Sequence, residues 1–183
     1  MRFFFSYIYK IIQKEIFMKV YLVIGDPDMG KSSVVRHLVA FTKGTGRSLL
    51  TKKLRVIHGH ATIDMYISFY GYQALQESGI LPQDFIRIVK KQPKQPSDLI
   101  LALRLKATKA NKKHKDCPDA DDYIQAFIKA GWTISKSVVL DDSGKAKYPN
   151  HWKALSVLSR PAQGKPTPTN QLAADTRKYF GWM

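Results

Sequence analysis

The clearest chemistry in this sequence lies in eight consecutive residues, Gly25, Asp26, Pro27, Asp28, Met29, Gly30, Lys31 and Ser32. They match the pattern G-x-x-x-x-G-K-[ST] at every defined position. Gly25 and Gly30 allow the backbone to turn tightly, so that successive N–H groups can point inward at phosphate oxygens. Lys31 has the charge and the length to reach terminal phosphates, and the hydroxyl of Ser32 is a suitable ligand for Mg²⁺. This spacing therefore predicts a site for a phosphate-rich ligand.

The residues on either side of the loop predict the strand and the helix that position it. An apolar run over residues 19–24 has the length and composition of a buried parallel strand, and it ends at Gly25. Over residues 31–42 the apolar positions recur with helical spacing, and Gly44 follows as a stop signal. A helix that begins near Lys31 would add its N-terminal N–H donors and the positive end of its dipole to the turn.

With these flanks, the loop resembles that of the P-loop NTPase superfamily. The resemblance implies a three-layer α/β sandwich with a mostly parallel sheet, and the binding of ATP with Mg²⁺. It also implies that Lys31 is a catalytic residue and that Ser32 holds the metal. The implied nucleotide-binding set is Gly25, Asp26, Pro27, Asp28, Met29, Gly30, Lys31, Ser32 and Ser33. ATP is preferred to GTP because no guanine-reading Asn-Lys-x-Asp motif occurs. The alternative is a glycine-rich turn that binds nothing.

Two carboxylates inside the loop, Asp26 and Asp28, lie close to a site that is meant for anions. We interpret them as solvated turn formers, with Pro27 fixing the bend between them. The alternative is that Mg²⁺, or the outward face of the loop, accommodates their charge.

A hydrolytic site of this family usually needs an acid at the end of an apolar strand, to hold Mg²⁺ or to polarise the attacking water. Asp64 follows one apolar segment, and Asp141 with Asp142 follows a better one of three apolar residues. Asp141 is therefore the predicted catalytic acid and, beside Ser32, a predicted metal ligand. Its place late in the chain argues against this role, because the resemblance implies a strand next to the first. A solvated strand end is the alternative.

Two arginines, Arg104 and Arg160, are candidates for stabilising charge in a reaction, although most such arginines merely lie on the surface. The apolar run over residues 98–105 carries its acid, Asp98, at the wrong end for catalysis. Arg104 and Lys106 stand where the carboxylate is needed. Efficient hydrolysis is therefore less strongly implied than nucleotide binding.

Basic residues outnumber acidic ones by 30 to 14, and the net charge of +16 makes polyanions the first partner class to consider. One acid-free stretch begins inside the loop and another covers residues 99–115. The second contains five lysines, Lys106, Lys109, Lys112, Lys113 and Lys115. Such a segment can bind DNA or RNA phosphates, close as a lid over a nucleotide, or form a solvated surface. Because residues 106–115 contain no arginine, whose two donors suit a phosphoryl group, nucleic acid is the favoured interpretation.

Strand-like and helix-like segments alternate along residues 18–183, which predicts one α/β domain with a mostly parallel sheet. Strands are expected over 19–24, 54–68, 98–105 and 133–140, and helices over 31–42, 72–77, 83–89, 118–131 and 169–180. Residues 143–169 are rich in Pro, Gly and Lys, with an apolar island at 152–158.

Residues 1–17 form an aromatic extension that is either a wrongly assigned start, with Met18 as the natural one, or an amphipathic helix. The single cysteine, Cys117, cannot form an internal disulfide, which favours a cytoplasmic chain. No uncharged apolar run reaches about 18 residues, so no membrane-spanning segment is expected.

These features together predict a small ATPase that acts with or on nucleic acid. We expect it to work as a homo-oligomer or with a partner protein, because 183 residues lack the bulk of a complete helicase. One alternative is a small-molecule or nucleotide kinase whose lid spans residues 106–117. The other is a basic protein that binds nucleotide or nucleic acid without turnover.

Overall fold

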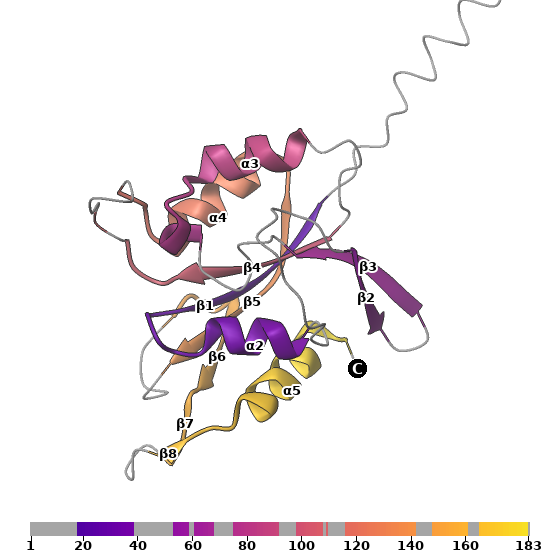
Figure 1. Cartoon of the computed structure of the whole chain (residues 1–183), viewed down its shortest axis with the longest axis vertical. Coiled ribbons are helices and arrows are strands. Elements are labelled where there is room, and N and C mark those ends of the chain that lie inside the picture. The colour runs from indigo at the N-terminus through magenta and orange to yellow at the C-terminus, as the bar shows by residue number, and fades with distance from the viewer. Residues whose placement is uncertain are drawn as a thin grey trace, which may run out of the picture.

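The computed structural model describes residues 18–38, 53–58, 61–67, 75–91, 98–107, 109, 116–141, 148–160 and 165–182. The aromatic extension over residues 1–17 lies outside the described residues. The protein folds around a six-stranded sheet in the order β2-β3-β4-β1-β5-β6 (Figure 1). The strands are β1 (Lys19–Gly25), β2 (Lys53–His58), β3 (Ala61–Ile67), β4 (Asp98–Arg104), β5 (Thr133–Asp141) and β6 (Trp152–Ser156).

The sheet is mostly parallel, as the sequence predicted. β3, β4, β1, β5 and β6 run in the same direction, and β2 joins one edge as the antiparallel partner of β3. The expected strand segment over residues 54–68 is a hairpin that is interrupted near Gly59. Parallel strands need crossover connections, and along the chain a helix over Pro82–Lys90 lies between β3 and β4 and a helix over Ala120–Lys129 lies between β4 and β5.

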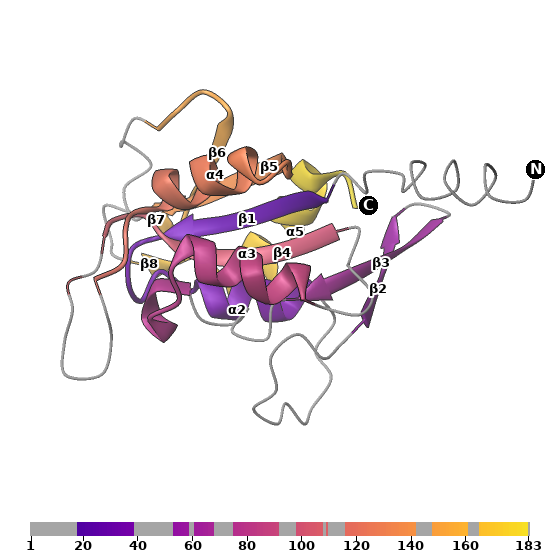
Figure 2. The ribbon, with the colours of Figure 1, turned by 90° about the horizontal axis from the view of Figure 1, so that it is seen from above.

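Helices cover both faces of the sheet (Figures 1 and 2). α2 (Lys31–Leu38) and α5 (Thr169–Phe180) lie on one face, whereas α3 (Pro82–Lys90) and α4 (Ala120–Lys129) lie on the other. A short 3-10 helix, η2 (Leu75–Ser78), precedes α3. α4 begins at Ala120, two residues later than predicted, because the Asp119 side chain caps it by accepting a hydrogen bond from the Asp122 N–H at 3.1 Å.

The central strand β1 explains why the core has two halves. Val20, Leu22 and Ile24 point to the α3–α4 side, and Tyr21 and Val23 point to the α2–α5 side, because successive side chains of a strand alternate. All five are buried. A strand that is covered on both faces needs apolar residues at every position, and this is why residues 20–24 read as one continuous run.

The segment over residues 143–169 carried no predicted strand or helix. Its apolar island forms β6 and the start of β7 (Leu158–Arg160), and β7 pairs with β8 (Lys165–Pro166) in a separate two-stranded sheet. β6 exists because it pairs with β5, with Trp152 beside Ser137. Local composition cannot reveal such a partner. Among the described helices, none has the length and apolar character that crossing a bilayer requires.

Candidate functional site

Three strands end together at the edge of the sheet where the Gly25–Ser32 loop begins. Gly25 of β1 lies beside Arg104 of β4 on one side and beside Leu140 of β5 on the other. The helix that follows β1 covers one face of the sheet, and the helix that follows β4 covers the opposite face. Connections that diverge in this way open a crevice at the carboxyl ends of the strands, which is where α/β proteins bind ligands.

The loop itself is a turn that leads directly into a helix. The Met29 N–H donates to the Asp26 carbonyl at 3.4 Å, and the Val34 N–H donates to the Gly30 carbonyl at 2.9 Å, which starts α2. Asp28 and Gly30 have positive φ angles of 63° and 77°. The order of strand, loop and helix is the one that the sequence predicted, so the first N–H groups of α2 lie at this edge of the sheet.

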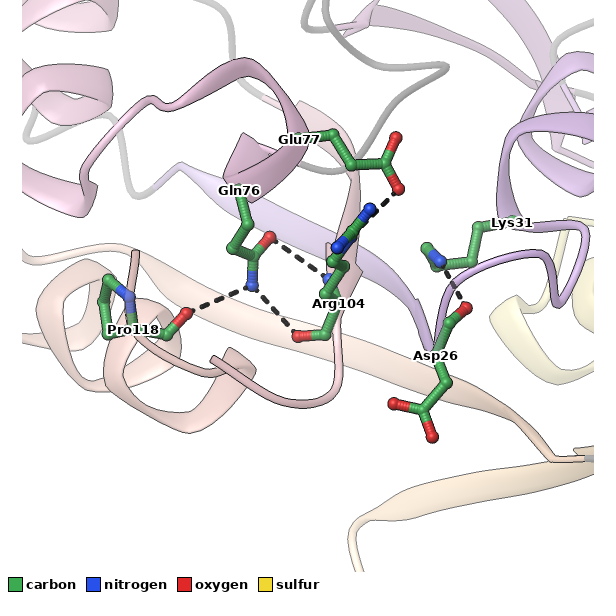
Figure 3. A network of polar contacts seen from close by, with 6 residues as sticks. All are labelled: Asp26, Lys31, Gln76, Glu77, Arg104 and Pro118. Atoms are coloured by element: carbon green, nitrogen blue, oxygen red, sulfur yellow. Dashed lines mark hydrogen bonds and ion pairs between the residues drawn. The ribbon is translucent and has the colours of Figure 1, made fainter. Parts of the chain in front are cut away.

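Lys31 lies inside the site, with only 4% of its surface exposed. Its Nζ donates a hydrogen bond to the Asp26 carbonyl at 2.7 Å (Figure 3). Burial lowers the pKa of Lys31 from its usual value of 10.5, and the negative charge of Glu77 opposes this effect most strongly. Arg104 lowers the same pKa further, whereas Asp26 and Asp28 raise it. The site therefore holds a desolvated ammonium group, which an anion would stabilise.

Glu77 is a site residue that the sequence analysis missed. It lies on η2, and its carboxylate forms an ion pair with Arg104 at 3.2 Å, with about a quarter of each side chain exposed (Figure 3). The acids predicted for the site, such as Asp141, follow apolar strands in the sequence. Glu77 lies in a short 3-10 helix instead, and it has no apolar strand before it that would mark it. Arg104, which was a candidate only as a charge-stabilising arginine, therefore lies beside the loop together with a carboxylate.

Gln76 fixes the place of Glu77. This side chain is 1% exposed, and its amide bonds both backbone groups of Arg104: Nε2 donates to the carbonyl at 3.0 Å, and the Arg104 N–H donates to Oε1 at 3.1 Å. The same Nε2 lies 3.4 Å from the Pro118 carbonyl (Figure 3). Among the described residues, β3 pairs with β4 at Leu99 and Ile100, and the Gln76 amide bonds the backbone at the other end of β4, as a strand neighbour would.

Asp141 lies one residue beyond Leu140, at the end of the strand that pairs with β1. The objection that its strand comes late in the chain is therefore removed, because β5 is the direct neighbour of the loop strand. Asp141 is buried, and its carbonyl accepts a hydrogen bond from the Val157 N–H at 2.7 Å. Asp142 lies outside the described residues.

Asp64 is excluded from the site by its register. β3 meets β4 at Tyr66 and Leu99, and Leu99 lies beside Val20 at the start of β1. Asp64 therefore belongs to the opposite edge of the sheet. Val20 and Gly25 alone are about 16 Å apart along the strand, at roughly 3.3 Å per residue.

The remaining predicted residues fall into two groups. Pro27 and Asp28 are exposed, whereas Asp26, Met29, Ser32 and Ser33 are partly exposed around the buried Lys31. Lys106 and Lys109 are exposed in the segment that leaves β4, and the backbone N–H of Leu105 in that segment donates to the Gly25 carbonyl at 3.2 Å. Three of the five lysines and one of the two arginines have side chains outside the described part of the chain, namely Lys112, Lys113, Lys115 and Arg160.

The described residues form no preassembled cluster of metal-binding side chains. Within the described ranges, no group of three or more His, Cys, Asp or Glu side chains is arranged to hold a metal ion. Mg²⁺ does not require such a group, because proteins usually bind it through one or two side chains together with the phosphates of a substrate.

A cavity of about 410 Å³ lies at the opposite edge of the sheet, between α4 and the first half of β5. Ile124, Ile128 and Trp132 form part of its apolar lining, and His151 lies at its border. None of the loop residues contributes to it. This cavity is therefore separate from the loop edge, which is the edge of the sheet where the Gly25–Ser32 loop begins.

Comparison with protein-family models, with curated proteins and with solved structures finds no match to this chain. The geometry at the loop edge is therefore the basis for a functional proposal.

The left-handed backbone at Gly30 yields a direct test of the loop. A Cβ at this position would meet nothing within 4 Å, so the cost of a substitution comes from φ alone. We expect Gly30→Ala to lower the free energy of unfolding by about 1–2 kcal/mol. Gly30→Asn should cost less than half as much, because asparagine tolerates this conformation. Urea denaturation measures both, and equal losses would contradict the assigned backbone geometry.

Proposed function

We propose that this chain binds ATP together with Mg²⁺ at the Gly25–Ser32 loop and hydrolyses it. The observation that carries the proposal is the buried ammonium group of Lys31, placed where the carboxyl ends of β1, β4 and β5 meet. A charge in such a place costs free energy unless an anion accompanies it. Triphosphate oxygens would supply that anion, and the N–H groups at the start of α2 would bind them.

The residues around the loop suit the individual tasks of such a site. Lys31 would contact the β- and γ-phosphates after releasing the Asp26 carbonyl. Ser32 and Asp141 would hold Mg²⁺, which neutralises charge on the phosphates when it is bound. The lack of a preformed metal cluster among the described residues agrees with a metal that arrives with its nucleotide.

We further propose that the polyanion partner is DNA or RNA, bound by the lysine-rich segment over residues 106–115. Support comes from the exposure of Lys106 and Lys109 and from the hydrogen bond that ties the start of this segment to Gly25. A nucleic acid bound there would lie next to the nucleotide and could change its turnover. The same hydrogen bond also supports the kinase alternative, because a lid has to begin at the edge of the nucleotide site.

A turnover assay separates these functions. Phosphate release from ATP is measured with Mg²⁺ alone, with single-stranded or double-stranded DNA, and with RNA. Stimulation by one of these polymers supports the proposed ATPase, whereas turnover that requires a small acceptor supports the kinase. Binding of a fluorescent ATP analogue without turnover leaves a nucleotide-binding protein, and absence of binding overturns the proposal.

Neutralising the lysine segment should remove the effect of nucleic acid and leave the basal reaction intact. We expect the fourfold replacement of Lys109, Lys112, Lys113 and Lys115 by glutamine to lower the salt dependence of binding, with a loss of about three in the slope of log K against log salt. The matched control replaces four exposed lysines elsewhere, namely Lys91, Lys129, Lys153 and Lys178. An equal effect in both variants would show that only net charge matters.

A further inference from the structure

The ion pair between Glu77 and Arg104 is the feature of the site that the P-loop pattern does not explain. The two side chains come from η2 and from the end of β4, and each is partly exposed at the loop edge. Arg104 lies directly beside Gly25 in the strand register. Glu77 is the strongest charge influence on Lys31, ahead of both loop carboxylates. The pair therefore lies near the group that would contact the γ-phosphate.

The position of this pair is set by the buried amide of Gln76. Two hydrogen bonds join that amide to the backbone of Arg104, so η2 cannot shift along β4 without breaking them. Glu77 follows Gln76 directly in η2, and its carboxylate lies beside the guanidinium of Arg104 (Figure 3). Catalytic groups need this kind of fixed support, because a displacement of about 1 Å is costly in rate.

Two of the acids at the loop edge, Asp141 and Glu77, differ in access. Asp141 is buried at the end of β5, whereas the Glu77 side chain is 25% exposed on the β4 side of the loop. A water molecule at the end of a nucleotide can reach an exposed carboxylate without any rearrangement of the core. The acid that activates water and the acid that supports a metal can therefore be two residues on opposite sides of Lys31.

We propose that Glu77 is the catalytic base of this site, and that Arg104 holds it in an ion pair until a γ-phosphate draws the guanidinium away. This inference depends on the proposed ATPase function. Arg104 would exchange one anion, the carboxylate, for another, the phosphoryl group, which suits its planar set of donors. Glu77 would then be free to accept a proton.

The chemical step balances with ATP and water alone. The water oxygen forms a bond to the γ-phosphorus while the bond from that phosphorus to the bridging oxygen breaks, and the electron pair leaves on ADP. Glu77 takes one proton from the water and later returns it to solvent or to the phosphate product. Arg104 and Lys31 stabilise the charge that develops on the phosphoryl oxygens.

Variants of the full chain that remove one charge of the ion pair test this assignment. We expect Glu77→Gln to bind a fluorescent ATP analogue within about threefold of the wild-type Kd and to lose at least about 100-fold in phosphate release. Arg104→Gln should weaken ATP binding by about tenfold and leave ADP binding unchanged, because only ATP presents a γ-phosphate. Circular dichroism melting curves establish that both variants remain folded.

A second ion pair in the chain provides the control. Asp84 and Arg87 lie 3.3 Å apart on α3, are more exposed than the Glu77–Arg104 pair, and do not belong to the loop edge. Asp84→Asn should leave binding and turnover within twofold of the wild type. Turnover by Glu77→Gln that also stays within threefold would overturn the role of Glu77 while leaving ATP hydrolysis intact.

Two further outcomes distinguish this inference from the function beneath it. A wild-type chain that binds ATP but releases no phosphate overturns the catalytic role of Glu77 and retains the nucleotide site. A wild-type chain that binds no nucleotide overturns both proposals. If Glu77→Gln melts early, Glu77→Asp replaces it, and turnover about tenfold below the wild type with unchanged Kd supports the assignment.

Discussion

Replacing Lys31 by methionine should abolish the proposed nucleotide chemistry of this protein and leave the ligand-free fold at least as stable as before. Methionine fills the space of the buried lysine stem but carries no charge. We expect ATP binding to weaken by about 100-fold and phosphate release to fall by about 1000-fold, because a charge-assisted contact to the phosphates is lost. Titration with a fluorescent ATP analogue and a phosphate-release assay measure the two effects.

The stability of the same variant should change in the opposite direction. Because burial lowers the pKa of Lys31 in the folded state, the unfolded chain holds the proton more tightly. The charged lysine therefore destabilises the empty fold at neutral pH, and this cost disappears as the pH rises through the usual value of 10.5. We expect Lys31→Met to gain about 1 kcal/mol at pH 7, and the gain should shrink toward pH 10.

A lysine on the same strand serves as the control for Lys31. Lys19 begins β1 at the opposite edge of the sheet and is exposed. Lys19→Met should leave nucleotide binding unchanged. If Lys31→Met bound ATP as well as the wild type, the loop would not be a nucleotide site.

Replacing Gln76 by leucine should cause the largest loss of stability among the polar variants. The amide is buried and bonds the N–H and carbonyl of Arg104, with a longer contact to the Pro118 carbonyl. Leucine keeps the volume and leaves these backbone groups without their partner. We expect a loss of about 3 kcal/mol in the free energy of unfolding, which lowers the Tm by about 6–12 °C in a chain of this size.

An exposed glutamine separates burial from residue type. Gln171 donates from Nε2 to Asp175 at 3.0 Å within α5, in full contact with solvent. Gln171→Leu should therefore cost less than about 0.5 kcal/mol. Similar losses at both glutamines would contradict the role of Gln76 as a substitute for a strand neighbour. Differential scanning calorimetry of the two variants provides the comparison.

Much of the fold could be predicted because its signals are local. The apolar run of β1 and the helical spacing after Lys31 lie within 20 residues of the loop, and both elements form where they were expected. The spacing between Gly25 and Lys31 likewise requires a turn with a lysine behind it. Short-range patterns of this kind survive folding, because tertiary contacts reinforce them.

The errors have a different origin. No strand was predicted at Trp152 because its partner, Ser137, is 15 residues away in sequence and adjacent only in the sheet. Glu77 was overlooked because its importance comes from Arg104, which lies 27 residues further along the chain. The position of Asp141 late in the sequence argued against its role as the catalytic acid, although β5 pairs directly with β1.

The sequence by itself determined the loop, the strand before it, the helix after it and the excess of positive charge. Only the tertiary structure decided which carboxylates meet that loop, because strand order is set by long-range pairing and by the burial of both faces of the sheet. A parallel sheet brings the carboxyl ends of distant segments to one edge. Glu77 and Arg104 come together there as an ion pair that neither segment predicts by itself.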